Sequence, residues 1–109
     1  MRVLFDQGVP VPLRMYFSVD VETCYERGWS DLANGKLIEA AESEFEVLVT
    51  TDKNLRYQQN LVERQLAVLV LPTPRWPTLL PFASLIAREA ESLLPKAFVE
   101  WTPPTDPDS

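Results

Sequence analysis

Apolar residues in this chain gather in short runs that alternate with amphipathic segments, the pattern of an α/β protein. The run over residues 66–71 is apolar at every position, which is typical of a central strand buried on both faces of a parallel sheet. In contrast, residues 18–24 alternate between apolar and polar side chains, which predicts a strand with one buried face. The runs that predict strands cover residues 2–5, 18–24, 46–51, 66–71 and 97–101.

Helices are predicted in the intervals between these strands. Pro10 and Pro12 suit the start of the first helix, because the first turn of a helix does not use the N–H group that proline lacks. The clearest helix covers residues 80–94, where apolar residues recur at helical spacing until Pro95 ends the segment. The remaining segments are predicted as helices from residue 34 and over 53–62, and as loops over 26–30 and 72–81.

This alternation predicts a three-layer α/β/α sandwich around a mostly parallel sheet of about four to five strands. With 109 residues, 46% of them hydrophobic, the chain is expected to form one domain over residues 1–102, followed by a flexible polar tail over 103–109. No apolar run approaches the roughly 20 residues that span a bilayer, and no signal-peptide core precedes Asp6. The single cysteine fits a reducing compartment. We therefore expect a soluble cytoplasmic protein with no membrane partner.

Composition narrows the chemistry further. The chain contains no histidine, which excludes Ser-His-Asp and Cys-His mechanisms and histidine-ligated zinc. A net charge of −6 argues against broad nonspecific binding to nucleic acid. Negative charge concentrated at a metal site is compatible with a small nuclease, because the metal reverses the local sign.

Two aspartates, Asp6 and Asp52, each follow a predicted strand. In a parallel sheet both would lie at the carboxyl edge, where such folds place their sites, and carboxylate oxygens suit Mg²⁺ or Mn²⁺. The structural alternatives are a turn for Asp6 and a helix N-cap for Asp52, worth on the order of 1 kcal/mol. A divalent ion would remove the repulsion between two adjacent carboxylates, and the pair together therefore favours a metal site.

Three basic residues are candidate contacts for a phosphodiester backbone. Lys53 and Arg56 are three positions apart and share a face of the predicted helix, while Arg14 belongs to the first helix. The alternative for each is a solvated helix face. Cys24 has no basic neighbour closer than Arg27 and is expected to be an inert, partly buried thiol.

Three segments together resemble the PIN-like (PilT N-terminal) nuclease superfamily, closest to its small single-domain bacterial branch related to toxin–antitoxin ribonucleases. The segments are VLFDQGVP at 3–10, NGKLIEAA at 34–41 and VLVTTDKNL at 47–55. The resemblance implies an endoribonuclease that uses Mg²⁺ or Mn²⁺. It places Asp6 and Asp52 as catalytic acids and metal ligands, with Asn34 and Asn54 completing the metal site.

The chain departs from the family pattern at Gln7, Asn34 and Asn54, where the family often carries acids. An amide keeps a carbonyl oxygen but loses the charge that holds a divalent ion. Asp31 is a candidate replacement ligand. Two hypotheses follow: a ribonuclease with a partly degenerate site, or a catalytically weakened PIN-like fold that binds RNA, an antitoxin-like protein or a second copy of itself.

Overall fold

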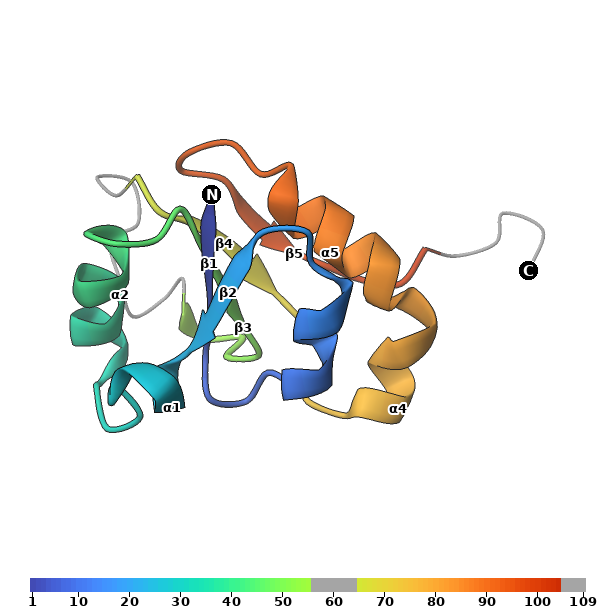
Figure 1. The fold of residues 1–109 in the computed structure, drawn as a ribbon, viewed down its shortest axis with the longest axis horizontal. Coiled ribbons are helices and arrows are strands. Elements are labelled where there is room, and N and C mark those ends of the chain that lie inside the picture. Colours follow the sequence, from blue (N-terminus) through green and yellow to red (C-terminus); the bar gives the residue numbers. More distant parts are fainter. Residues whose placement is uncertain (56–64, 105–109) are drawn as a thin grey trace.

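The computed structural model describes residues 1–55 and 65–104 of the chain. Within them a five-stranded sheet has the strand order β2-β1-β3-β4-β5, and every neighbouring pair is parallel (Figure 1). Each strand falls inside a segment that the apolar pattern predicted, so the strand predictions are confirmed. The strands are β1 (Arg2–Phe5), β2 (Asp20–Thr23), β3 (Val47–Thr50), β4 (Ala67–Val70) and β5 (Phe98–Glu100).

Helices cover both faces of the sheet, as the predicted sandwich requires. One face packs against α1 (Cys24–Arg27) and α2 (Asn34–Glu42). The other face packs against η1 (Val11–Tyr16), α4 (Trp76–Leu79), η3 (Leu80–Phe82) and α5 (Ala83–Glu91).

The alternation of side chains along each strand divides the core into two clusters. In β3, Val47 and Val49 belong to the cluster under α5, whereas Leu48 belongs to the cluster under α2. All three side chains have no exposed surface. Burial of both faces explains why β3 and β4 are apolar at nearly every position.

Two local predictions are wrong, and each is explained by the residues at the start of a helix. Residues 24–27 form helix α1, where a strand end and a loop were predicted. The Thr23 hydroxyl accepts the backbone N–H of Glu26, and the Glu26 carboxylate accepts that of Thr23, so a capping box starts the helix. The predicted loop at 72–81 contains α4 and the start of η3, because Pro77 and Pro81 lie in first turns that need no N–H donor from them.

The first predicted helix begins as expected but is a 3₁₀ helix. Pro10 precedes η1, and the carbonyl of Pro10 accepts the N–H of Leu13, three residues on. The clearest predicted helix is shorter than expected, since α5 ends at Glu91. The predicted helix over 53–62 falls largely outside the described residues.

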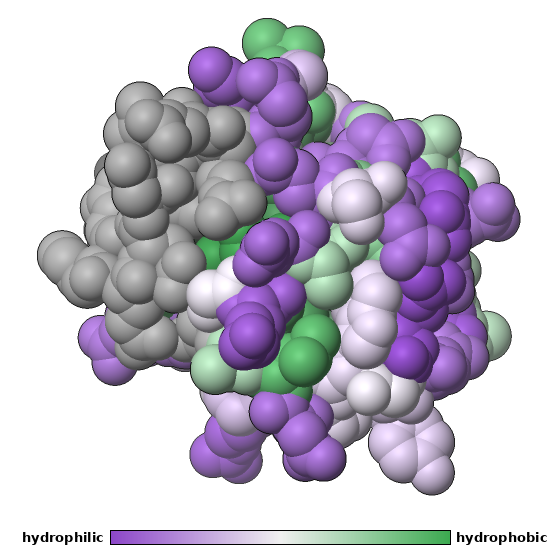
Figure 2. All heavy atoms as spheres, turned by 90° about the vertical axis from the view of Figure 1, so that its left-hand side faces the viewer, coloured by the Kyte–Doolittle hydropathy of each residue, from purple (hydrophilic) through white to green (hydrophobic). Residues whose placement is uncertain are grey.

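The surface formed around α1 and α2 is mostly hydrophilic where the described residues are visible (Figure 2). Only small apolar areas lie between its polar side chains. Among the described residues, none of the helices has the length and apolar character needed to cross a membrane.

Candidate functional site at the carboxyl edge of the sheet

The strand order brings the two predicted aspartates to adjacent strand ends. After β1 the chain forms β2 on one side of β1, and it then crosses to form β3 on the other side. In open parallel sheets such a reversal opens a crevice at the carboxyl ends of the strands, and ligands bind there. Asp6 directly follows β1, and Asp52 lies two residues beyond the end of β3. The sequence could not fix this adjacency.

A buried hydroxyl links the carboxylate of Asp6 to the backbone of Asp52. Thr50 has no exposed surface, and its Oγ1 donates to Asp6 Oδ2 at 2.8 Å. The same oxygen accepts the backbone N–H of Asp52 at 3.0 Å. The backbone N–H of Asp6 also donates to the carbonyl of Val49 at 2.9 Å. Thr50 therefore fixes the end of β1 against the turn that follows β3.

Each aspartate also accepts a local backbone hydrogen bond. The N–H of Gln7 donates to Asp6 Oδ1 at 2.7 Å, and the N–H of Asn54 donates to Asp52 Oδ1 at 2.9 Å. Asp52 thus makes the capping-type contact that was the structural alternative for it. A carboxylate has several lone-pair sites, so this contact does not occupy its full binding capacity.

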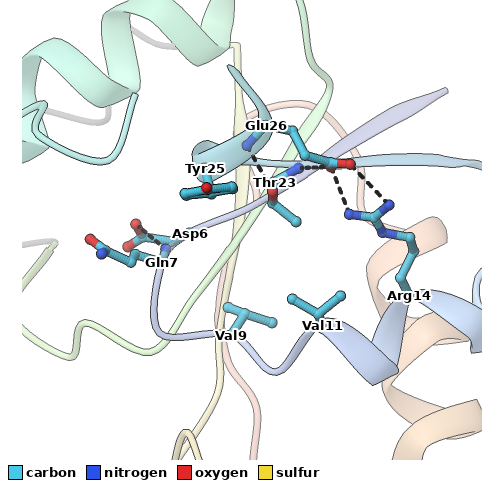
Figure 3. A pocket seen from close by; sticks show the side chains of 8 residues that line it. All are labelled: Asp6, Gln7, Val9, Val11, Arg14, Thr23, Tyr25 and Glu26. Carbon is cyan, nitrogen blue, oxygen red and sulfur yellow. Dashed lines mark hydrogen bonds and ion pairs between the residues drawn. The ribbon is translucent and has the colours of Figure 1, made fainter. Parts of the chain in front are cut away.

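A pocket of about 430 Å³ opens beside Asp6, between the ends of β1 and β2 (Figure 3). On the side of the pocket away from Asp6, Arg14 donates two hydrogen bonds to Glu26. The shorter one is 2.6 Å, between Nη2 and Oε1. The Arg14 hydrogen bond is the main cause that lowers the pKa of Glu26, with a smaller contribution from the backbone of Thr23. The pocket is lined by Asp6, Gln7, Val9, Val11, Arg14, Thr23, Tyr25 and Glu26.

The sequence prediction did not include Thr23, Tyr25 and Glu26 among the site residues. Residues 26–30 were expected to form a loop, with no constraint on where their side chains would lie. The signal was present as Thr23-x-x-Glu26, the spacing of a capping box, which predicts a helix start directly after β2. That helix start places Tyr25 near Asp6 and directs the Glu26 carboxylate toward Arg14 (Figure 3).

A third element of this edge is the close approach of Gly8 to Thr51. A Cβ atom built on Gly8 would overlap with Thr51 Oγ1. We expect Gly8→Ala to lower the free energy of unfolding by about 1–3 kcal/mol, as overpacking does elsewhere, measured by urea denaturation. Thr51→Ala removes the opposing oxygen, so most of the loss should disappear when Gly8→Ala is made in that background. An equal loss in both backgrounds would show that the contact is not the cause.

The donors at this edge suit a hard divalent cation in kind, although they are few. Both aspartates are partly exposed, and their oxygens are the ligand type that Mg²⁺ and Mn²⁺ prefer. Within residues 1–55 and 65–104, no group of three or more His, Cys, Asp or Glu side chains is arranged to hold a metal ion. Asp31 therefore does not complete the pair, and from the described residues a further ligand would be an amide, a hydroxyl or a backbone carbonyl.

The other predicted site residues are dispersed. Asn34 is the first residue of α2, which begins at this end of the molecule (Figure 1), and Asn54 reaches Asp52 through its backbone N–H. Lys53 lines a separate pocket of about 160 Å³ with residues of β4 and β5. Arg56 lies outside the described residues. Cys24 is buried. Its burial, and to a smaller extent the negative charge of Asp6, raises the pKa of its thiol to about 12, which agrees with the expected inert thiol.

Comparisons with known proteins add no relative to this picture. No protein-family model, no curated protein and no solved structure matches the chain.

Proposed function

We propose that this protein is a metal-dependent ribonuclease of the PIN-like type with a reduced acidic site. Asp6 and Asp52 hold one Mg²⁺ or Mn²⁺ ion, and oxygens of Asn34 and Asn54 or water complete its coordination. The observation that carries the proposal is the hydrogen-bonded link through Thr50, which ties the Asp6 carboxylate to the backbone N–H of Asp52 at the reversal point of a parallel sheet.

The charges around Asp6 support a cation at this position. The pocket beside it contains two carboxylates, Asp6 and Glu26, and one guanidinium, Arg14, which Glu26 already engages. An anionic phosphodiester would be repelled by this lining unless a cation compensated it. A divalent ion held by Asp6 and Asp52 would supply that compensation, and the chemistry it would bring is the activation of water for hydrolysis.

The chain's own groups position the reactants. Asp6 and Asp52 are held in place by Thr50, Gln7 and Asn54, and so little conformational entropy remains to be lost when an ion binds. Lys53, which lines the pocket next to β4 and β5, provides a cationic group for the phosphates of an RNA strand, whereas the charge of Arg14 is already offset by Glu26.

The test is a calorimetric titration of Mn²⁺ into the wild type and into Asp6→Asn/Asp52→Asn. We expect binding in the wild type and at least a tenfold loss of affinity in the double variant, since both charged ligands become neutral amides. Asp20→Asn is the matched control, because Asp20 is an exposed acid at the opposite end of β2 and should leave the affinity unchanged. Absence of binding to the wild type at millimolar Mn²⁺ would contradict the proposal.

A second candidate function is a catalytically weakened PIN-like fold that binds RNA, an antitoxin-like protein or a second copy of the chain. The shortage of acids favours it, since the described residues bring no third acid, cysteine or histidine to Asp6 and Asp52. It predicts that Asp6→Ala/Asp52→Ala retains wild-type affinity for single-stranded RNA in a fluorescence anisotropy titration. Loss of RNA binding in a folded double variant would count against this function.

A further inference from the structure

We propose that the pocket beside Asp6 accepts one unpaired nucleobase of single-stranded RNA, stacked on the ring of Tyr25. This inference rests on the proposed ribonuclease function and deepens it by assigning a base-binding site. The pocket lies at the end of β1 and β2, and Asp6 forms part of its lining.

The walls of the pocket suit a flat aromatic ligand. The Tyr25 side chain is 84% exposed, although the capping box fixes the helix turn from which it projects. Figure 3 shows its ring edge-on, with Val9 and Val11 on the other side of the gap. Val11 is itself 56% exposed. A planar base between these groups would stack on the ring of Tyr25 with one face and contact the aliphatic carbons of Val9 and Val11 with the other.

The rim of the pocket suits the polar edge of a base. Asp6 and Gln7 lie at one side of the pocket, and Arg14 and Glu26 lie at the other (Figure 3). Their carboxylates accept hydrogen bonds from exocyclic amino and ring N–H groups, while the amide and the guanidinium donate to ring nitrogens and carbonyl oxygens. A purely aliphatic ligand would leave this rim unused.

The size and place of the pocket agree with a nucleotide unit. A volume of about 430 Å³ falls within the range of small-molecule sites. Asp6 belongs both to the pocket lining and to the link through Thr50. A base held here would therefore bring its own phosphate close to Asp6. Only an unpaired base can enter, because a paired base has its polar edge occupied and both faces stacked.

The test is an NMR titration with adenosine, which lacks a phosphate and so reports on base binding without metal. In the wild type we expect shifts of the Val9 and Val11 methyl signals that saturate with adenosine and do not occur with ribose. Tyr25→Ala should weaken adenosine binding on the order of tenfold or more. Tyr25→Phe keeps the ring and is the matched control, with affinity within about twofold of the wild type.

Equal adenosine affinity in the wild type and Tyr25→Ala, or no saturable shift at all, would overturn the base-binding site. The Mn²⁺ titration separates this failure from failure of the proposed function. Manganese binding without adenosine binding would remove the base pocket and leave the ribonuclease in place. Adenosine binding that depends on Tyr25, without Mn²⁺ binding, would keep the base pocket and remove the metal-dependent mechanism.

Discussion

Asp6→Asn is expected to slow Mn²⁺-dependent cleavage of single-stranded RNA by about a hundredfold or more. The substitution keeps the size of the side chain and its ability to accept the N–H of Gln7. It removes the negative charge of the carboxylate that accepts the Thr50 hydroxyl. Charge stabilisation by a bound metal ion is worth several kcal/mol in the transition state, and each 1.36 kcal/mol changes the rate tenfold. The measurement is the initial rate of cleavage of a fluorescent RNA at saturating Mn²⁺.

Asp20→Asn provides the comparison for this rate. It makes the same chemical change at the amino end of β2. In the sheet, Asp20 lies opposite Arg2, which is at the far end of β1 from Asp6. Its cleavage rate should stay within about twofold of the wild type, because the charge removed is distant from the acid pair. Equal rates for Asp6→Asn and the wild type, with both proteins folded, would rule out a catalytic role for Asp6.

The largest expected effect on stability belongs to Leu48→Ala. Leu48 lies in the central strand β3, has no exposed surface and packs in the core cluster under α2. Removing its three outer carbons leaves a cavity and should lower the free energy of unfolding by about 2–5 kcal/mol. A domain of this kind has a total stability of about 5–15 kcal/mol, so the urea midpoint should fall steeply.

Leu94→Ala makes the same substitution where the side chain is 75% exposed. It should change the free energy of unfolding by no more than about 0.5 kcal/mol. If the two variants unfolded at the same urea concentration, the burial of Leu48 under α2 would be wrong.

The sheet could be predicted from the sequence because its strands are short, strongly apolar and separated by clear breaks. Residues 66–71 have no polar position, and a run of this length is short for a buried helix, so a central strand was the favoured interpretation. The strand ends followed from the same pattern, which is why Asp6 and Asp52 were found at the carboxyl edge. Local sequence was sufficient for both.

The remaining features depend on contacts between distant segments. The position of β1 between β2 and β3 is decided by packing of the whole sheet, and no local motif specifies it. The pairing of Arg14 with Glu26 likewise needs η1 and α1 to lie next to each other. Tyr25 continued the alternation of β2 in sequence, so only the capping box distinguished a helix there, and that signal is short.

The all-parallel arrangement of the sheet also affects how the chain reaches its native state. Parallel partners cannot be joined by a tight turn and need a long connection, and β1 pairs with β3 across residues 6–46. Folding dominated by such distant contacts is slow for a given chain length. Until β3 and β5 flank it, the apolar segment 66–71 is exposed to other unfolded molecules. Aggregation during synthesis therefore competes with the slow folding of this sheet. Slower synthesis at low temperature should favour the folded product.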